Sequence, residues 1–369
     1  MMFSQFFCSS NRPRSRAIER FASLLLPLED DELTKLVSES ERLTRRFFGK
    51  TMRLFAPLYL SNECINSCKY CGFSRDNPIL RVTLTVDEVE KEARHLAKLG
   101  FRSILLVSGE HPKYVSVAYL EQVIKRLSTF IPSIAIEVAP MEVEDYKPLI
   151  VAGAEGVAVY QETYDRAVYA ELHTAGPKKD FDWRLDCPER AYAAGFRRIG
   201  VATLFGLSDW RSEAVCLAEH IEYLLKKCWR AHISASVPRL RPAAGGFKPR
   251  HKFSDRDLLQ FLCALRVTFP QIAIVLSTRE SAPMRDALML LGVTIMSAGS
   301  RTDPGGYTHQ GTDSLHVTVR GKISKAVGEA ADGQFEVEDS RPADQVVEAL
   351  RHCGLEPVWK DWDSSILVR

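Results

Sequence analysis

Residues 56–71 read Ala-Pro-Leu-Tyr-Leu-Ser-Asn-Glu-Cys-Ile-Asn-Ser-Cys-Lys-Tyr-Cys, a short apolar run that leads directly into a cysteine-rich loop. The apolar run, residues 56–60, has the length and composition of a buried strand. Cys64, Cys68 and Cys71 follow it, with three residues and then two residues between them. The stretch therefore predicts a strand whose carboxyl end carries a compact set of three thiols.

Similar short runs alternate with segments of helical period as far as residue 297, which is typical of parallel βα units. The predicted strands are residues 56–60, 103–108, 134–138, 156–160, 198–202, 232–237, 272–277 and 294–297. The helices between them are expected at residues 86–99, 119–130, 143–152, 188–194, 213–226, 255–268 and 283–291. Eight strands in this order favour an α/β fold, a (β/α)8 barrel of the TIM type.

The two ends of the chain read as appendages of one barrel, because neither repeats nor low-complexity linkers separate them. Residues 1–50 are expected to form an N-terminal helical segment, which is polar over residues 30–46. Residues 51–300 would form the barrel, and residues 301–369 a C-terminal extension packed on it. That extension is expected to contain a Gly-rich loop, an extended stretch and a final helix near residues 343–353.

The composition is that of an ordinary soluble globular protein: of 369 residues, 46% are hydrophobic and 26% charged. The 49 Lys and Arg nearly balance the 47 Asp and Glu, which argues against nucleic acid or an anionic membrane surface as the main partner. The longest apolar run, residues 287–296, is too short to span a membrane. Nine cysteines, an odd number, are not typical of a secreted disulfide scaffold, so we expect a cytoplasmic protein.

Three thiolates at this spacing suit three corners of a [4Fe-4S] cluster. Such a cluster usually takes four protein thiolates, so three would leave one iron open to an exogenous ligand. A zinc site and incidental cysteines are the alternatives. Zinc would need a fourth Cys or His nearby, whereas the next His along the chain is His95 and the next Cys is Cys187.

A Cys-x3-Cys-x2-Cys loop after the first barrel strand resembles the radical S-adenosylmethionine (SAM) superfamily. The resemblance implies a [4Fe-4S] cluster whose open iron chelates SAM, and whose one-electron reduction cleaves SAM to methionine and a 5′-deoxyadenosyl radical. From about residue 35 to about residue 365, the chain resembles the 2-iminoacetate synthase family, the tyrosine lyases of thiamine biosynthesis. The motifs that carry this resemblance are residues 57–62, 159–164, 180–185, 277–280, 296–307 and 357–363.

The resemblance assigns two segments to SAM. Tyr70, just before the third cysteine, matches an aromatic residue that packs near the adenine, although it could equally shield the cluster from solvent. Ser108, Gly109 and Glu110 match a Gly-Gly-Glu motif that orients the SAM ammonium group, with Ser108 in place of the first glycine. The alternative for this segment is a turn that merely ends a strand.

Two charged residues farther along complete the implied SAM site. Glu162 and Arg184 resemble residues that contact the ribose and the carboxylate of SAM in related enzymes. Arginine suits a carboxylate because its fork of donors binds both oxygens. Glu162 could instead simply pair with Arg184.

Substrate binding is implied at the ends of the last two strands. By resemblance, Arg279 should bind the tyrosine carboxylate with help from Ser297, and Ser300 closes the same strand end. The alternative for Arg279 is an ion pair with Glu280 or Asp286, because surface arginines commonly find such partners.

The implied reaction is cleavage of L-tyrosine to 2-iminoacetate (dehydroglycine) and 4-methylphenol, with thiazole synthase as partner and flavodoxin or ferredoxin as electron donor. Two related alternatives are the tryptophan lyase of nosiheptide synthesis and the tyrosine lyase of [FeFe]-hydrogenase maturation. The latter adds a second cluster on a C-terminal extension, whereas only Cys353 lies beyond residue 263 here. A metal-stabilised binding module is the alternative of a different class. Such a module would not need charged residues such as Glu110 and Arg279 to lie together at the strand ends.

Overall fold

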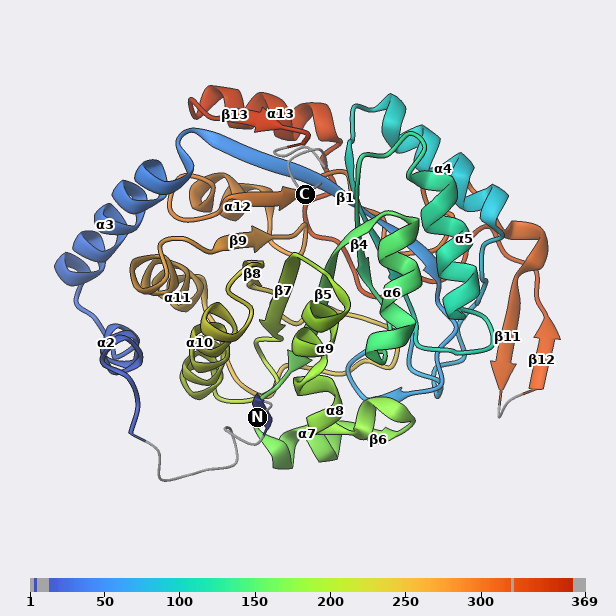
Figure 1. The fold of residues 1–369 in the computed structure, drawn as a ribbon, viewed down its shortest axis with the longest axis horizontal. Coiled ribbons are helices and arrows are strands. Elements are labelled where there is room, and N and C mark those ends of the chain that lie inside the picture. Colours follow the sequence, from blue (N-terminus) through green and yellow to red (C-terminus); the bar gives the residue numbers. More distant parts are fainter. Residues whose placement is uncertain (1–2, 5–12, 320–321, 361–369) are drawn as a thin grey trace.

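The computed structural model describes residues 3–4, 13–319 and 322–360, and a closed parallel barrel forms its centre (Figure 1). Neighbouring barrel strands pair in parallel, and β10 pairs with β1 to close the ring. The barrel strands are β1 (Thr51–Ser61), β3 (Ser103–Ser108), β4 (Ser133–Glu137), β5 (Ala154–Glu162), β7 (Arg198–Thr203), β8 (His232–Ser236), β9 (Ala273–Leu276) and β10 (Ile295–Ser297). The predicted (β/α)8 fold is therefore confirmed.

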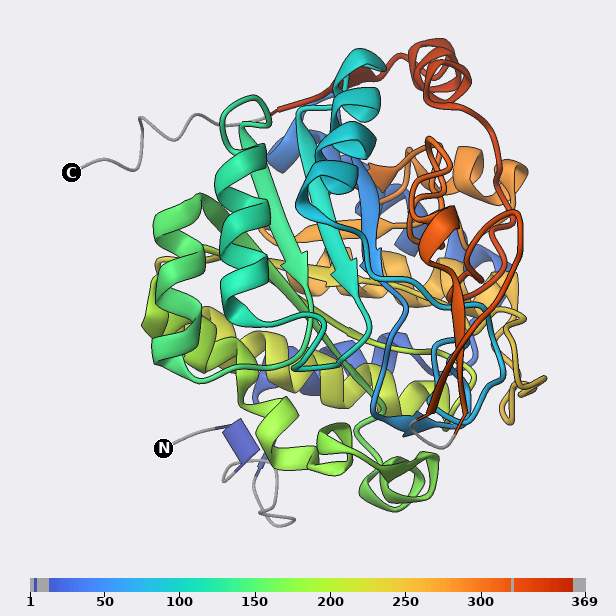
Figure 2. The same ribbon diagram turned by 90° about the vertical axis from the view of Figure 1, so that its right-hand side faces the viewer.

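Helices cover the outside of this barrel, as Figure 2 shows for the cyan and green helices α4 to α6. The covering helices are α4 (Val86–Lys98), α5 (Val117–Leu127), α6 (Val143–Ala152), α9 (Cys187–Ala194), α10 (Trp210–Lys227), α11 (Asp255–Thr268) and α12 (Ala282–Leu288). In α5, Leu120, Val123 and Leu127 are buried because residues three and four apart share one face. Within the described ranges, no helix is both long and apolar enough to cross a membrane.

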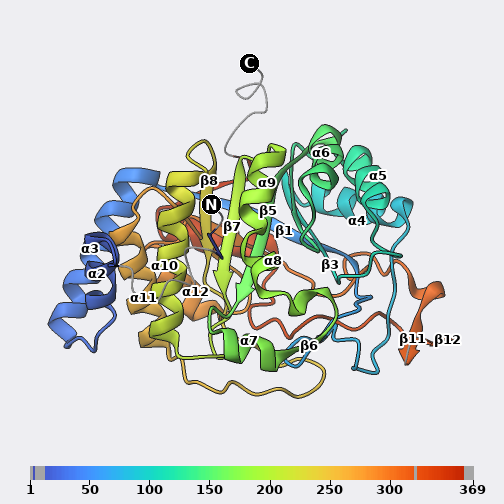
Figure 3. The same ribbon diagram turned by 60° about the horizontal axis from the view of Figure 1, so that its bottom comes forward.

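In the N-terminal segment, α2 (Arg16–Leu24) and α3 (Asp30–Phe48) pack against the barrel helices on one side (Figure 3). The Gln260 amide of α11 donates to the carbonyls of Leu24 and Leu26 at 2.8 and 2.7 Å. The polar helix expected over residues 30–46 is α3, whereas the sequence pattern does not predict α2.

The C-terminal extension returns to the start of β1. There β13 (Glu356–Val358) pairs in parallel with residues 51–53, after the expected final helix α13 (Ala343–His352). Earlier in the extension, η2 (Thr312–Ser314) precedes an antiparallel hairpin of β11 (His316–Val319) and β12 (Lys322–Lys325). The hairpin lies at one edge of the molecule in Figures 1 and 3.

A group of short elements lies between β5 and α9, and Figure 3 shows α7, α8 and β6 together at one end of the barrel. They are α7 (Arg166–Leu172), β6 (His173–Ala175), η1 (Pro177–Lys179) and α8 (Phe181–Leu185). β6 pairs antiparallel with β2 (Ser67–Cys68), which lies inside the cysteine loop. The insertion thus holds the cysteine loop at the carboxyl ends of the strands, where active sites of this fold lie.

Candidate active site

The three predicted cluster cysteines lie in one loop after β1. Cys68 is buried, Cys64 and Cys71 are half-buried, and all three are free thiols. The Cys71 N–H donates to the Cys68 carbonyl at 3.2 Å, so the chain turns tightly between them. Burial raises the pKa of Cys64 and of Cys68, and negative charge on the neighbouring thiolates raises both further. Cys64 and Cys68 therefore need a cationic partner before they become thiolates.

This donor set suits a cluster rather than one bound ion. In the part of the chain that the structure describes, no group of three or more His, Cys, Asp or Glu side chains could hold a metal ion. The thiols of a cubane site instead sit at separate corners, each on its own iron. The amides of Asn66 and Gln334 approach the sulfur atoms of Cys64 and Cys71 at 3.7 and 3.9 Å, contacts that favour thiolates.

The segment after β3 packs directly on the cysteine loop. A Cβ atom at Gly109 would lie 2.2 Å from the Glu63 carbonyl oxygen, so glycine is required at this position. The Asn66 amide donates to the carboxylate of Glu110, which links Glu110 to the loop that holds the cysteines. The hydroxyl of Ser108 is buried and has no hydrogen-bond partner among the described residues. A buried hydroxyl without a partner therefore lies beside a carboxylate that is tied to the cysteine loop, as in a ligand site.

Glu162 ends β5 with a φ of 70°, a left-handed conformation that is uncommon outside glycine and clusters at functional sites. Its carboxylate lies 2.7 Å from Lys178 Nζ and 3.8 Å from a guanidinium nitrogen of Arg184. Burial works to raise the pKa of Glu162, but the positive charges of Lys178 and Arg184 outweigh it and lower the pKa. The alternative pairing with Arg184 is thus present. The sequence pattern does not predict Lys178, which lies in the short insertion.

Tyr70 stands in an apolar wall beside the cysteine loop. It packs in a buried cluster with Leu172, Leu204 and Leu207. Its hydroxyl shares a hydrogen bond of 2.8 Å with Nε2 of His173, the first residue of β6. Such a ring presents an apolar face with a fixed orientation, which suits both roles expected for Tyr70.

The residues expected to bind substrate line a cavity of about 60 Å³ inside the barrel, at the carboxyl ends of the strands. Arg279, Ser297 and Ser300 are all in its wall. The Arg279 guanidinium lies 3.4 Å from the centre of the Phe335 ring, and the Thr278 N–H donates to Ser297 Oγ at 3.2 Å. The Ser300 hydroxyl is buried without a hydrogen-bond partner among the described residues.

The ion pairs proposed as the alternative role of Arg279 are not formed. Glu280 accepts two hydrogen bonds from the Arg239 Nε, at 3.0 and 2.9 Å, and Asp286 pairs with Arg341 at 2.9 Å. Arg279 itself forms no ion pair within the described ranges; its guanidinium reaches only the Arg239 carbonyl, at 3.5 Å. Its charge is therefore available to a ligand in the cavity.

The same cavity is also lined by residues that the sequence pattern does not predict. Glu137, the last residue of β4, and Tyr160 of β5 line it. Gln334 of the extension forms part of the roof, because it accepts a hydrogen bond from the Tyr59 hydroxyl at 2.8 Å. The Gln334 carbonyl also accepts from the Gly72 N–H at 3.2 Å. One residue of the extension thus joins the cavity to the cysteine loop.

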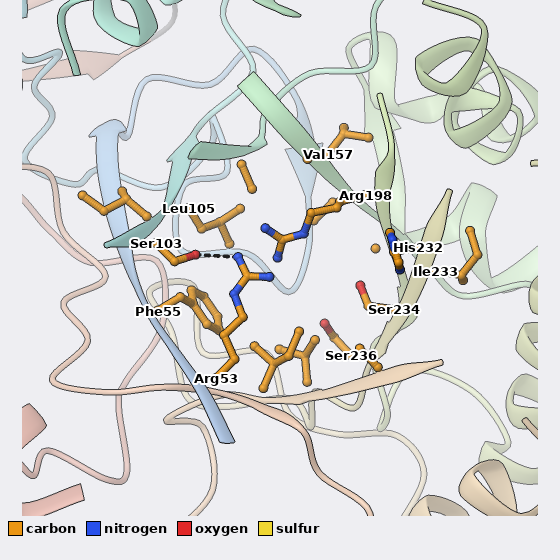
Figure 4. Close-up of a pocket in the computed structure, with 18 of the residues that line it drawn as sticks. Arg53, Phe55, Ser103, Leu105, Val157, Arg198, His232, Ile233, Ser234 and Ser236 are labelled. Atoms are coloured by element: carbon orange, nitrogen blue, oxygen red, sulfur yellow. Dashed lines mark hydrogen bonds between the residues drawn. The ribbon is translucent and has the colours of Figure 1, made fainter. Parts of the chain in front are cut away.

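A second cavity, of about 290 Å³, lies in the barrel at the amino ends of the strands (Figure 4). Arg53 donates to the hydroxyls of Ser103 and Ser133 at 2.7 and 3.0 Å. Arg198 pairs with Glu155 at 2.5 Å and also donates to Ser133 at 3.1 Å. The two cavities share a layer of side chains formed by Phe55, Leu105, Tyr160, Ser236 and Val275. Polar groups therefore lie at both ends of the barrel interior.

Comparison with known proteins places this arrangement in a family. Residues 58–215 match the radical SAM superfamily model, and residues 236–356 match the Biotin and Thiamin Synthesis associated domain. The 2-iminoacetate synthases of Salmonella typhimurium and Escherichia coli are each 41% identical to this chain over 343 residues, covering 93% of this chain and 86% of theirs. This chain belongs to the 2-iminoacetate synthase family.

A solved structure supports the same relationship. The FeFe-hydrogenase maturase HydG from Carboxydothermus hydrogenoformans has a TM-score of 0.83 and 35% identity, covering 97% of this chain and 79% of that chain. As a member of the 2-iminoacetate synthase family, the chain is a radical SAM lyase with a [4Fe-4S] cluster and SAM as cofactors. This confirms the predicted enzyme class and cofactors, in place of a metal-stabilised binding module.

Proposed function

We propose that this protein cleaves the Cα–Cβ bond of L-tyrosine to 2-iminoacetate and 4-methylphenol, and that 2-iminoacetate supplies the thiazole of thiamine. The observation that best supports this is the cavity at the carboxyl ends of the strands, where the charge of Arg279 has no carboxylate partner among the described residues. An α-amino acid supplies such a carboxylate. The relatives with 41% identity carry the name of this activity.

In this proposal, Cys64, Cys68 and Cys71 hold the [4Fe-4S] cluster and leave one iron for SAM. When bound, the cluster and SAM would supply the radical chemistry that cleavage of the substrate needs. The backbone at Gly109 and the carboxylate of Glu110 orient the SAM ammonium group beside the cysteine loop. The hydrogen bond from Asn66 to Glu110, and the contact of Gly109 with the Glu63 backbone, attach this segment to the cysteine loop and support that role.

Glu162, Arg184 and Tyr70 complete the proposed SAM site. Glu162 accepts from the ribose hydroxyls, Arg184 binds the SAM carboxylate, and the Tyr70 ring packs beside the adenine. Lys178 holds the Glu162 carboxylate in its ionised, accepting form, since the pair lies 2.7 Å apart. Each of these groups lies on β5, the short insertion or the cysteine loop.

The substrate site uses the other wall of the cavity. The Arg279 guanidinium binds the tyrosine carboxylate through two parallel hydrogen bonds, and the hydroxyls of Ser297 and Ser300 add further donors. The Phe335 ring packs on one side of the guanidinium. A pocket that ligand binding closes to water would suppress side reactions of reactive intermediates.

Thiazole synthase is the proposed recipient, because the imine product hydrolyses readily in water. We also propose flavodoxin or ferredoxin as electron donor and the cytoplasm as location. The proposed units are residues 1–50, the barrel at residues 51–300, and the extension at residues 301–369 packed on it. The pairing of β13 with the start of β1 supports this packing.

A tyrosine lyase of [FeFe]-hydrogenase maturation is the second candidate, because HydG shares the fold at 35% identity. The identity of 41% to the 2-iminoacetate synthases favours the thiamine reaction. A tryptophan lyase differs in its substrate, so an assay that offers both amino acids separates it from the proposed activity.

The test is an anaerobic assay of the iron- and sulfide-reconstituted protein with SAM, a reductant and either L-tyrosine or L-tryptophan. We expect 4-methylphenol and 5′-deoxyadenosine with L-tyrosine, together with glyoxylate from hydrolysis of the imine. Deoxyadenosine without 4-methylphenol would contradict the tyrosine lyase. Cys68→Ala should lose both the cluster absorbance and SAM cleavage, and retained SAM cleavage in that variant would contradict the proposed cluster ligands.

A further inference from the structure

One carboxylate of the substrate cavity has no role in the function proposed so far. Glu137 ends β4, at the carboxyl end of the barrel, and lines the same cavity as Arg279. Glu137 is half-buried, and within the described part of the chain it forms neither a hydrogen bond nor an ion pair. A carboxylate partly withdrawn from bulk water is costly unless a cation or donor meets it. A ligand is therefore expected to supply that partner.

The charges around Glu137 show where this ligand lies. Four charged side chains act on Glu137: Glu162, Arg279, Arg184 and Lys178. Arg279 belongs to the substrate wall, whereas the other three form the proposed SAM wall. The phenols of Tyr59 and Tyr160 also face it and are sensitive to its charge. Glu137 is thus within electrostatic reach both of the group proposed to bind the substrate carboxylate and of the groups proposed to bind SAM.

The electrostatics of the site leave Glu137 poised to take up a proton. Burial raises its pKa to about 7, and the negative charge of Glu162 adds to the increase, whereas Arg279, Arg184 and Lys178 oppose it. General bases with a pKa near the working pH transfer protons efficiently. The remaining titratable neighbours, Tyr59 and Tyr160, have pKa values raised by burial and stay neutral in this range.

We propose that Glu137 binds the α-ammonium group of the substrate and accepts one of its protons. The inference rests on the proposed function, since it assumes an amino acid whose carboxylate is on Arg279. In the step, one N–H bond of the ammonium group breaks and an O–H bond forms on Glu137. The nitrogen keeps the electron pair, so a neutral amine and a neutral carboxylic acid result, and nothing is oxidised or reduced.

This placement brings the amino group of the substrate towards the proposed SAM wall. An amino acid held at its carboxylate by Arg279 places its nitrogen two bonds from the carboxylate carbon. Glu137 then fixes the nitrogen on the side of the cavity that faces Glu162 and Lys178. A neutral amine also carries a lone pair that stabilises a neighbouring radical, which an ammonium group lacks. Glu137 is therefore a catalytic residue of this site.

The test uses the cluster-loaded protein with SAM but without reductant, so that binding is measured without turnover. Anaerobic calorimetry compares L-tyrosine with 3-(4-hydroxyphenyl)propanoate, which lacks only the amino group. We expect the native protein to prefer L-tyrosine by tenfold or more, and Glu137→Gln to lose most of this preference while binding the propanoate equally well or better. Glu137→Asp, which keeps the charge, should retain part of the preference.

A pH series gives a second readout. L-tyrosine affinity of the native protein should rise from pH 6 to pH 8 as Glu137 ionises, and that of Glu137→Gln should stay flat. An unchanged preference in a folded Glu137→Gln protein, or equal loss of both ligands, would overturn the inference. If the native protein binds neither ligand, the proposed function itself fails. Tyrosine binding with an unchanged preference would leave that function standing. Circular dichroism of both variants establishes that each is folded.

Discussion

The two ends of the barrel interior both carry carboxylates and guanidinium groups, but these groups are paired at one end and unpaired at the other in the described residues. At the amino ends, Glu155 pairs with Arg198 at 2.5 Å and accepts a hydrogen bond from Ser133. At the carboxyl ends, Glu137 and Arg279 share one cavity without forming an ion pair with each other or with a neighbour in the described ranges. The charged groups at the amino end therefore form hydrogen bonds and ion pairs with one another, whereas Glu137 and Arg279 at the carboxyl end are available to bind a ligand.

This difference distinguishes charged side chains that stabilise the barrel from charged side chains that bind a ligand. A buried charge that is paired and hydrogen-bonded adds little information about function, because its desolvation is already offset. A buried charge without a partner lowers stability, so its presence indicates a task that needs it. The larger cavity lies at the amino ends, yet the smaller one, with its unpartnered groups, is the candidate active site.

The largest expected effect is at Arg279. Arg279→Gln should lower kcat/KM for 4-methylphenol formation about 1,000-fold, roughly 4 kcal/mol, because a charge-assisted fork is lost. Thermal stability should change little, since Arg279 has no ion pair to break among the described residues. The matched control is Arg198→Gln, which should lose stability but keep its activity per folded molecule. Equal losses of activity in both variants would remove the distinction between the two ends.

The next largest effect is on the free energy of unfolding, when the ion pair at the amino ends of the barrel strands is broken. Glu155→Gln removes the partner of a largely buried Arg198 and should lower the free energy of unfolding by about 2 to 4 kcal/mol. Denaturant titration followed by tryptophan fluorescence measures the change. A variant as stable as the native protein would show that this network is not structural.

Removing the charge of Glu137 should raise the stability of the protein, whereas removing that of Glu155 should lower it. Its pKa rises from an ordinary 4.5 to about 7, so between these values the folded state holds a proton that the unfolded chain has lost. Stability due to this group therefore falls as the pH rises through that window. Glu137→Gln should gain roughly 1 to 2 kcal/mol at pH 8 and almost nothing at pH 5, measured by denaturation at both values. Loss of stability at pH 8 would contradict an unpartnered carboxylate.

The smallest effects are expected when the hydroxyl groups of Ser103 and Ser300 are removed one at a time. Ser103 accepts from Arg53 at 2.7 Å, so Ser103→Ala should cost about 1 kcal/mol of stability. The buried Ser300 hydroxyl has no partner among the described residues, so Ser300→Ala should leave stability unchanged and weaken tyrosine binding a few-fold. Calorimetry of tyrosine binding and thermal melts of both variants check the pair. A larger loss of stability in Ser300→Ala would contradict the comparison.

The sequence predicts the eight strands and their covering helices because period and composition mark long, regular elements. It does not predict the insertion at residues 166–185, whose elements span only three to seven residues and so show no period. Tyr70 and Glu162 stand out because they belong to motifs. Glu137 and Lys178 are isolated charges, and only the packing of distant segments reveals what surrounds them. Strand-end position was the one signal available for Glu137.

The contact of Gln334 with the cysteine loop has a consequence for how the enzyme is made. Gln334 reaches Tyr59 across 275 positions of sequence, and its carbonyl holds Gly72 of the loop. A chain leaving the ribosome exposes its cysteines long before this roof exists. The cover over the cysteine loop is therefore complete only once the C-terminal extension has folded onto the barrel.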